Sequence, residues 1–276
     1  MAAKDILLSL DLGLKDCFYR IRREVHHGSK VIYVVVKSLD IIPEESQTYG
    51  PAVIRELSKL NVWYSAWNTL TVFKDEGGVR GEPDTFEPHA LSKKQILGDY
   101  DLLSIFELKV IESVKVRVFR VEWKGRKCFL KIARFGFELD WLAQEIKVYH
   151  ALAQNTPPIA PRILGYAFEE PFHRVVGFVY EEIIGRRPEI MDLKTCQIAL
   201  QQLHDLDILH GDINRDNMFI TPDGTKFIDF EDSCIGPMGN GERWKEQMSN
   251  ETQSLAEKLL DETGRGRPLT LGNGAS

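Results

Sequence analysis

One stretch decides the fold of this 276-residue chain: HGDINRDNMFITPDGTKFIDFEDS, from His210 to Ser233. Its centre, Pro222 to Gly224, has strong turn chemistry between two apolar segments, which predicts a β-hairpin. A hairpin brings its two ends together, so we expect Asn217 and Asp229 to lie side by side with Asp212 next to them. Carboxylate and amide oxygens suit Mg²⁺, which prefers a few such ligands together with substrate phosphate. The stretch therefore predicts a magnesium site at the open end of the hairpin.

The same stretch resembles the catalytic loop and metal-binding motif of the protein-kinase-like superfamily. Its H-G-D-x-x-x-x-N and I-D-F-E forms are more similar to aminoglycoside and choline phosphotransferases than to ordinary protein kinases. They best fit the small kinase-like proteins of uncertain activity found in fungi. The resemblance implies that Asp212 is the catalytic residue, which orients a hydroxyl acceptor and accepts its proton. It also implies that Asn217 and Asp229 bind Mg²⁺ and that ATP supplies the phosphoryl group.

A kinase-like site also needs a lysine on its third strand and a glutamate on the next helix, to hold the ATP phosphates. The segment CFLKIAR places Lys131 in an apolar strand, where an unpaired charge would be costly. A helix predicted over residues 137–154 supplies Glu145 as its partner, with Glu138 as the competitor. We therefore expect Lys131 and Glu145 to bind the cofactor as a pair.

The segment FVYEEIIG, Phe178 to Gly185, resembles the hinge between the two lobes of a kinase. There the backbone from Glu181 to Ile183 would pair with the edge of the adenine ring. The alternative is an ordinary strand end without a binding role.

Periodicity and turn residues predict the other elements. In the second half of the chain, strands are expected at residues 105–113, 114–123, 126–134, 162–168 and 174–180, and further helices at 191–206 and 243–260. In the first half, strands are expected at 16–24, 30–38 and 69–73, with a helix that carries Val53, Ile54, Leu57 and Leu60.

Residues 74–94 are rich in Gly, Pro and charge and have no apolar period, which is typical of a linker. We therefore expect an N-terminal α/β extension at 1–92, of unassigned role, and a kinase-like domain at 93–260. Its small lobe would span about 100–182 and its reduced large lobe about 183–260, with a flexible tail at 261–276. The expected fold class is α+β, a two-lobed protein-kinase-like fold with a reduced C-terminal lobe.

Three features depart from the kinase pattern. The loop segment VIESVKVR, residues 110–117, has no glycine, whereas kinase loops close over phosphates with G-x-G-x-x-G. Only 47 residues follow Asp229, too few for the helices that hold a peptide substrate. Asn214 stands where many protein kinases have a lysine.

These departures leave two functions open. The first is an ATP-dependent phosphotransferase that acts on a hydroxyl of a small molecule, in preference to a protein. The alternative is a pseudokinase or scaffold that keeps the fold to bind a protein partner, which would bind through the N-terminal extension. The intact set of Lys131, Asp212, Asn217 and Asp229 opposes this alternative. A chain that is a fragment of a longer product would also explain the polar ending. Acidic residues near the motif, Asp216, Glu231 and Asp232, suit either a cationic acceptor or a surface without a role.

The composition excludes other classes. The chain has 35 Lys and Arg against 41 Asp and Glu, a net charge of −6, which argues against nucleic-acid binding. No apolar run approaches the roughly 20 residues of a membrane span, and no signal peptide is expected. The four cysteines have no CxxC spacing, which indicates reduced thiols and a cytoplasmic protein, with the nucleus not excluded.

Overall fold

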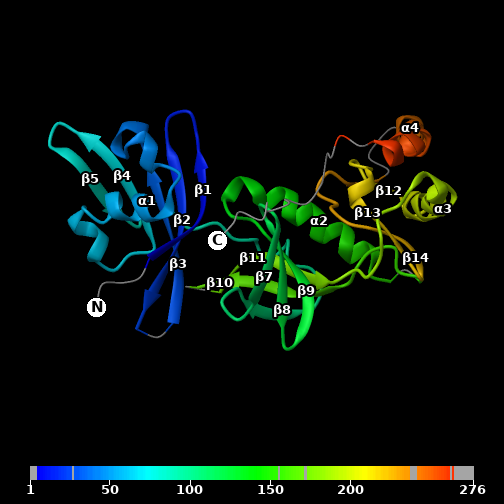
Figure 1. The fold of residues 1–276 in the computed structure, drawn as a ribbon, viewed down its shortest axis with the longest axis horizontal. Coiled ribbons are helices and arrows are strands. Elements are labelled where there is room, and N and C mark those ends of the chain that lie inside the picture. The colour runs from blue at the N-terminus through cyan, green and yellow to red at the C-terminus, as the bar shows by residue number, and fades with distance from the viewer. Residues whose placement is uncertain are drawn as a thin grey trace, which may run out of the picture. The chain divides into compact units, whose positions relative to one another are not determined.

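The computed structural model describes residues 5–26, 28–154, 156–170, 173–236, 241–261 and 263. The chain forms two compact units (Figure 1). The first holds residues up to Ala90 together with Arg134–Gly136 and Phe168–Val175. The second holds Leu91–Ala133, Phe137–Ala167 and the chain from Val176 onward.

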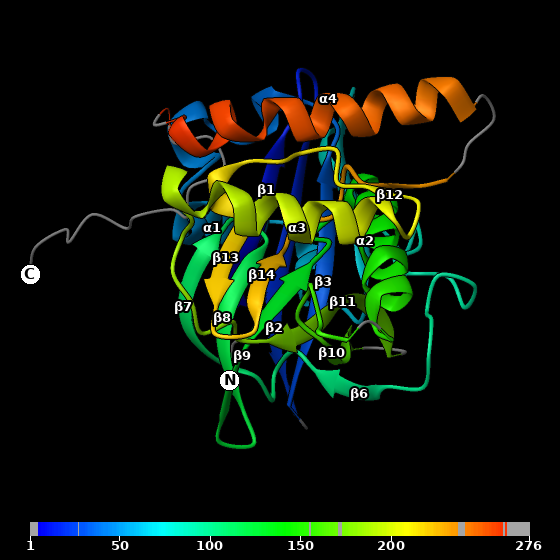
Figure 2. The ribbon, with the colours of Figure 1, turned by 90° about the vertical axis from the view of Figure 1, so that its right-hand side faces the viewer.

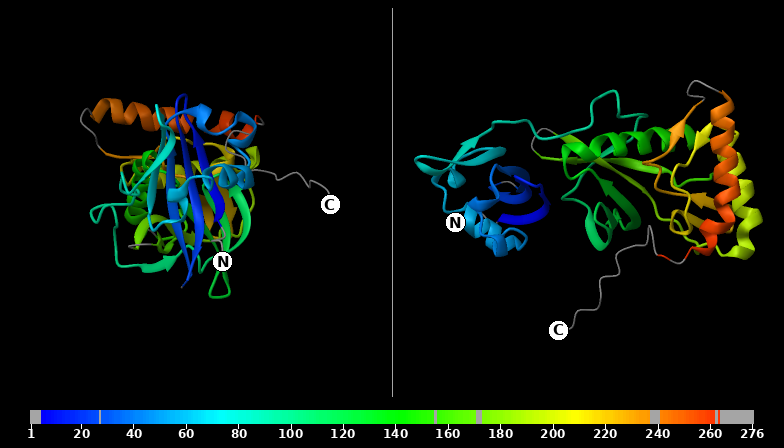
Figure 3. Two further views of the ribbon diagram at one scale, coloured as in Figure 1. Left: turned by 90° about the vertical axis from the view of Figure 1, so that its left-hand side faces the viewer. Right: turned by 90° about the horizontal axis from the view of Figure 1, so that it is seen from above.

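The first unit is built on a five-stranded sheet in the order β1-β2-β3-β4-β5, which the left view of Figure 3 presents in blue to cyan. Its strands are β1 (Asp5–Leu12), β2 (Cys17–Val25), β3 (Gly28–Val36), β4 (Thr69–Asp75) and β5 (Gly78–Pro83). Only the β3–β4 pair is parallel among these neighbours. The strands predicted at 16–24 and 30–38 are confirmed as β2 and β3.

The crossover between the parallel strands β3 and β4 carries the helix α1 (Gly50–Leu57). Pro51 lies in its first turn, where a missing N–H costs nothing. Short 3-10 helices flank it at Leu39–Ile41, Glu44–Ser46 and Asn61–Tyr64. Apolar side chains of α1 and of the sheet form one core, which includes Tyr19, Ile32, Val34, Val53, Leu57, Trp63, Trp67 and Leu70.

The prediction of a linker over residues 74–94 is wrong in part, because β5 lies inside it. This strand pairs with β4 through its backbone, while most of its side chains are exposed. An edge strand of this kind shows no alternation of apolar and polar residues, so its sequence reads as a loop. The strand β1, which the sequence analysis did not assign, is the other edge of the sheet.

A buried charge cluster within the first unit centres on Glu169, whose side chain is fully buried. Its carboxylate accepts hydrogen bonds from Arg20 Nε at 2.8 Å, Tyr33 Oη at 2.6 Å and Arg174 Nη2 at 3.1 Å. Burial alone would raise the pKa of Glu169, but the two guanidinium groups outweigh it and the pKa is lowered. The charges of this cluster therefore depend on one another.

The second unit contains most of a six-stranded sheet in the order β6-β10-β11-β9-β8-β7, of which Phe168, Glu169, Arg174 and Val175 belong to the first unit. Its strands are β6 (Asp101–Ser104), β7 (Lys109–Lys115), β8 (Val118–Trp123), β9 (Arg126–Ile132), β10 (Ile163–Glu169) and β11 (Arg174–Glu181). The strand predicted at 105–113 is displaced, because residues 105–107 form a turn and β7 begins at Lys109. Lys124 and Gly125 form the turn between β8 and β9, and both residues have a positive φ.

The helix α2 (Leu139–Leu152) packs on this sheet after a 3-10 turn at Gly136–Glu138. Tyr149 contacts the rings of Phe178 and Tyr180 on β11, with centroids 5.5 Å and 5.9 Å away. Together the sheet and α2 form the first of the two lobes of this unit.

In the residues that the structure describes, the other part of the second unit contains two α-helices, two short 3-10 helices and two short β-pairs. The helices are α3 (Leu193–His204), which follows a 3-10 turn at Ile190–Asp192, and α4 (Gly241–Leu260); they lie side by side (Figure 2). One β-pair joins β12 (Ile208–Leu209) to β15 (Cys234–Ile235), and the other joins β13 (Met218–Thr221) to β14 (Gly224–Phe227). The β12–β15 pair closes the stretch from His210 to Ser233 at its base, and the predicted hairpin lies inside it.

The α+β fold class predicted from the sequence is confirmed, including the reduced second lobe, which among the described residues holds α3, α4, two 3-10 helices and these short strands. The predicted tail at 261–276 lies almost entirely outside the described residues. Among the described helices, none has the length and apolar character needed to cross a membrane.

Replacing Glu169 with Gln tests the charge cluster of the first unit. The substitution keeps the shape but leaves two buried guanidinium groups without an anion, so we expect the free energy of unfolding to fall by about 3–5 kcal/mol. Chemical denaturation at neutral pH measures it. Glu170→Gln is the matched control, because its carboxylate pairs with exposed His173 and should matter by less than about 1 kcal/mol.

The same pair of proteins has an expected pH dependence. The lowered pKa of Glu169 stabilises the folded state above the unfolded pKa of about 4.3, and this contribution is lost as the pH falls toward the folded pKa. The difference in the free energy of unfolding between wild type and Glu169→Gln should therefore become smaller below about pH 4. If Glu169→Gln and Glu170→Gln lowered the free energy of unfolding equally at neutral pH, Glu169 would not be the anion that balances the two buried guanidinium groups.

Candidate active site

Lys131 is the centre of the candidate site. It lies on β9, between β8 and β11, and only 4% of it is exposed. Its ammonium Nζ contacts Glu145 Oε2 at 2.6 Å, Asp229 Oδ1 at 2.6 Å and Glu231 Oε1 at 3.1 Å. Burial alone would lower the pKa of Lys131, but the three carboxylates outweigh it, so the pKa is raised and the side chain stays charged.

Glu145 reaches Lys131 from α2 and is itself buried. Burial raises its pKa to about 7, and the adjacent ammonium limits the rise. Its other oxygen, Oε1, accepts a hydrogen bond from the Phe230 amide at 3.3 Å. Of the two glutamates considered from the sequence, Glu145 thus contacts Lys131, and Glu138 forms an ion pair with Arg117 at 3.8 Å.

Asp229 follows β14 in a left-handed backbone conformation, with φ of +67°. Asp tolerates this region better than most residues, and strained conformations of this kind cluster at functional sites. Its Oδ1 binds Lys131, and its Oδ2 accepts a hydrogen bond from Lys115 Nζ at 2.9 Å. Burial would raise the pKa of Asp229, but the two lysines hold it below its ordinary value, so it is ionised.

Asp212 is held by two asparagine side chains of its own loop. Asn214 Nδ2 and Asn217 Nδ2 each donate to Asp212 Oδ2 at 3.0 Å, and both also reach its backbone carbonyl. Asn214 additionally caps the short helix Arg215–Asn217 through its Oδ1. Asn214 therefore helps to fix the position of Asp212.

Two further residues, His210 and Glu251, fix the backbone of the loop that carries Asp212. His210 is fully buried, and its Nε2 lies 3.1 Å from the carbonyl of Ile228, the residue before Asp229. Burial lowers the pKa of His210, so the ring is neutral at ordinary pH. Glu251 on α4 accepts from the amides of Gly211 at 2.7 Å and His210 at 3.3 Å.

Glycine is required at position 211. Its φ is +83°, and an added Cβ would lie 2.1 Å from the carbonyl oxygen of Asp232. A side chain at position 211 would push this segment away from the segment that carries Asp232.

The donor set fits a hard divalent cation. Asn217 is buried, and its Oδ1 has no hydrogen-bond partner among the described residues. Its backbone carbonyl accepts from the Ile228 amide at 3.0 Å, which places it beside the Asp229 segment. An unpartnered amide oxygen near an ionised carboxylate matches the ligands that Mg²⁺ prefers. Oxygens of Glu145, Asp229 and Glu231 also lie within 4.8 Å of one another.

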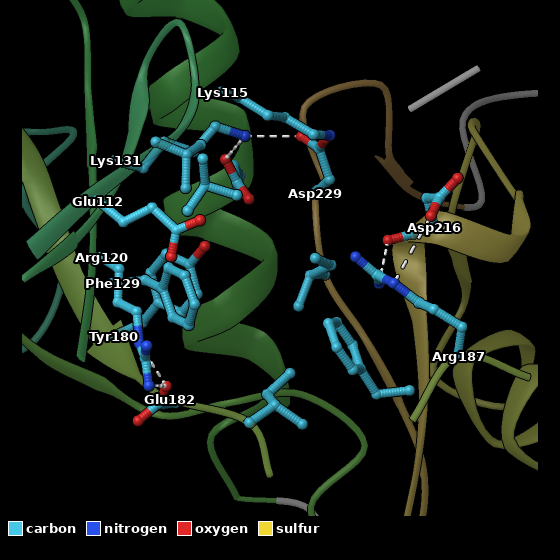
Figure 4. Close-up of a pocket in the computed structure, with 16 residues that line it drawn as sticks. Glu112, Lys115, Arg120, Phe129, Lys131, Tyr180, Glu182, Arg187, Asp216 and Asp229 are labelled. Atoms are coloured by element: carbon cyan, nitrogen blue, oxygen red, sulfur yellow. Dashed lines mark hydrogen bonds and ion pairs between the residues drawn. The ribbon is translucent and has the colours of Figure 1, made fainter. Parts of the chain in front are cut away.

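A cavity of about 290 Å³ lies beside this cluster (Figure 4), close to the lower limit for small-molecule sites. Lys115, Lys131 and Asp229 line one end. Stacked Phe129 and Tyr180, with centroids 5.6 Å apart, line its middle. The paired residues Arg187 and Asp216 lie on the opposite side (Figure 4), and Phe219 and Ile183 also line the cavity.

The two residues expected at the hinge differ in placement. Ile183 lines the cavity, next to Glu182, which pairs with Arg120. Glu181 lines a separate cavity instead, and its carboxylate binds Arg162 and Arg126. Its backbone amide donates to the Arg162 carbonyl at 3.0 Å, so this group is engaged within the protein.

Asp212 opens on a different, more polar cavity of about 500 Å³. Gln247, Asn250, Glu251 and Ser254 of α4 line it together with Asp232. The lysine cluster and Asp212 thus line two different cavities of the second unit.

Sequence reasoning missed three residues of the site. Lys115 was treated only as part of a loop without glycine, Glu231 only as local acidity, and Glu251 not at all. A lysine at the end of a strand in the glycine-poor loop could have marked Lys115. Nothing local marks Glu251, because its partners lie about forty residues earlier in the chain.

One family model, described as the phosphotransferase enzyme family, matches residues 196–240. The match covers a short part of the chain, which includes His210, Asp212, Asn217 and Asp229. No curated protein matches the chain. Lys131 and Glu145 lie outside the matched residues, yet the structure brings both to Asp229. The similarity indicates phosphoryl transfer in general.

A double-mutant cycle on Lys131 and Glu145 tests the cluster without any ligand. Lys131→Met leaves three carboxylates without their shared cation, whereas Glu145→Gln leaves Lys131 with two. We expect Lys131→Met to cost more, and the double variant to cost less than the sum by ~0.5–3 kcal/mol. Chemical denaturation measures the free energies of unfolding.

The exposed pair Lys109 and Glu122, 3.7 Å apart on β7 and β8, is the control for this cycle. Exposed pairs contribute little, so a cycle of Lys109→Met and Glu122→Gln should give a coupling below about 1 kcal/mol. Strict additivity at Lys131 and Glu145 would show that the two charges do not depend on each other.

Proposed function

We propose that this protein is an ATP-dependent phosphotransferase that moves the γ-phosphoryl group to a hydroxyl of a small molecule. The observation that carries the proposal is the convergence at Lys131. Charged residues from β9, α2 and the segment after β14 meet at the end of a cavity with aromatic walls. A buried lysine paired with a helix glutamate is the arrangement that positions ATP phosphates in kinase-like sites.

In this proposal each residue has one role. Lys131, braced by Glu145, binds the phosphates. Asn217 Oδ1 and the Asp229 carboxylate hold Mg²⁺, which neutralises charge on the phosphate oxygens. Asp212 orients the acceptor hydroxyl and accepts its proton, with Asn214 and Asn217 fixing its Oδ2. The hydrogen-bonded Oδ2 leaves Oδ1, which has no hydrogen bond within the described chain, to face the acceptor.

The cavity on the Asp212 side supports a polar acceptor. Its lining combines amide and hydroxyl groups of α4 with the carboxylates of Asp212, Asp232 and Glu251, against the single cation Lys258 among its described residues. This chemistry suits a hydroxyl-bearing small molecule better than an apolar one.

The alternative function is a pseudokinase or scaffold that keeps the fold for partner binding. One observation favours it: both carboxylate oxygens of Asp229 are bound by lysines, and the β7–β8 turn has no glycine. In that case the first unit, which corresponds to the N-terminal extension, would bind a protein partner. We also propose a reducing compartment, the cytosol or nucleus, because all four cysteines are free.

Nucleotide binding distinguishes these functions. With Mg·ATP at 100-fold its dissociation constant, the folded state should gain ~2.7 kcal/mol. For a unit of this size each kcal/mol corresponds to ~2–4 °C in melting temperature, so differential scanning fluorimetry should show a shift of several degrees. ATP with EDTA should give little shift, and Asp229→Asn should lose most of the metal-dependent part. No shift in the wild type would favour the scaffold.

Asp212→Asn tests the catalytic role. Release of inorganic phosphate from Mg·ATP, with water as the acceptor, should fall by roughly 10²–10⁴-fold, while ATP affinity stays within about twofold. The reason is that Asp212 acts on the acceptor and does not touch the nucleotide cavity. Asp223→Asn, at the exposed tip of the β13–β14 hairpin, is the matched control. Wild-type turnover by Asp212→Asn would exclude this role.

A further inference from the structure

The turn between β7 and β8 lacks the means to bind phosphate through its backbone. A backbone cradle for phosphate needs successive amides turned inward, which glycines with positive φ supply. Residues 109–118 contain no glycine, and none of them, all within the described chain, has a positive φ. Phosphate binding by this turn would therefore have to come from side chains.

Lys115 is the side chain in position to do so. The pairing of β7 with β8 is irregular between Ser113 and Lys115, and such bulges redirect side chains. Lys115 lines the cavity beside Lys131 and points at Asp229 from the sheet side (Figure 4). Its Nζ lies 2.9 Å from Asp229 Oδ2, and about 29% of the side chain is exposed.

A second cation holds the turn in place independently. Arg117 forms ion pairs with Glu231 and Glu138, and only 15% of its side chain is exposed. The Arg117 guanidinium also lies 5.7 Å from the centroid of the Trp141 ring. Lys115 can thus change partners without releasing the turn.

The partner of Lys115 must change if Asp229 binds a metal. Both oxygens of Asp229 are bound by lysines, so a cation that takes this carboxylate displaces at least one of them. Lys131 retains Glu145 and Glu231, whereas no second anionic partner of Lys115 is found among the described residues. Lys115 is therefore the one that leaves, and the negative phosphates of the metal–nucleotide complex are its nearest new partners.

We infer that Lys115 is a phosphate-binding residue that takes the place of a glycine-rich loop, exchanging Asp229 for a nucleotide phosphate when Mg²⁺ binds. This inference rests on the proposed nucleotide binding and adds to it a residue and an exchange. In the absence of metal, Lys115 occupies Asp229 and competes with Mg²⁺ for it. With Mg·ATP bound, the same ammonium contributes to affinity.

The test is nucleotide binding by isothermal titration calorimetry with adenosine, Mg·ADP and Mg·ATP. Lys115→Gln should weaken Mg·ATP binding by roughly tenfold or more, the effect of one charge-assisted hydrogen bond. Adenosine binding should stay within about twofold, which also shows that the variant is folded. Lys115→Arg should recover most of the lost affinity. Lys109→Gln, on the same strand but paired with Glu122 away from the cavity, is the control and should match wild type.

Lys115→Gln should have the opposite effect on the binding of a metal ion in the absence of nucleotide. Lys115→Gln should bind Mn²⁺ alone more tightly than wild type, because the competing ammonium is gone. A residue with only a structural role would weaken both ligands or neither. Electron paramagnetic resonance of free Mn²⁺ measures this arm.

The outcomes separate the two proposals. If wild type binds Mg·ATP and Lys115→Gln binds it equally well, the role of Lys115 is overturned and the proposed function stands. An equal loss for adenosine and Mg·ATP would also overturn it, since Lys115 would then not act at the phosphates. If wild type binds no nucleotide with or without metal, the proposed function fails and the inference fails with it.

Discussion

The buried ammonium of Lys131 is the constraint on which the second unit depends. An unpaired charge in such a place would cost several kcal/mol, and removing one partner of a buried pair costs almost as much. Three carboxylates, from α2 and from the segment after β14, balance it. Because Lys131 contacts carboxylates from both places, its burial holds the sheet, α2 and the segment after β14 in one geometry.

The loop around Asp212 is fixed by a second set of contacts that meets the first at Asp229. His210 bonds the carbonyl before Asp229, Gly211 allows close approach to Asp232, and Glu251 holds the loop amides from α4. These contacts hold Asp212, the proposed base, and Asp229, a proposed metal ligand, in fixed positions. Phosphoryl transfer depends mostly on positioning and on charge stabilisation, so a loop fixed in this way suits it.

The hairpin was predictable from the sequence, because turn residues are a local signal. The pairing of Lys131 with Glu145 was expected from the resemblance to kinase-like sites, and the structure decides between Glu145 and its competitor Glu138. The sequence did not reveal the edge strand β5, because most of its side chains are exposed. It did not reveal Glu251 either, because the partners of that residue are distant in sequence. The direction of Lys115 depends on a strand irregularity that no spacing rule reveals.

The most direct test of the account is a crystal structure grown with Mn²⁺ and a non-hydrolysable ATP analogue, with the metal located by its anomalous scattering. The account predicts a metal peak bonded to Asn217 Oδ1 and the Asp229 carboxylate, at roughly the 2.0–2.2 Å expected for a hard cation of this size. The phosphates of the analogue should contact Lys131, and its adenine ring should lie between Phe219 and the sheet. A nucleotide bound without metal at these two residues, or a cavity still empty at saturating analogue, would contradict it.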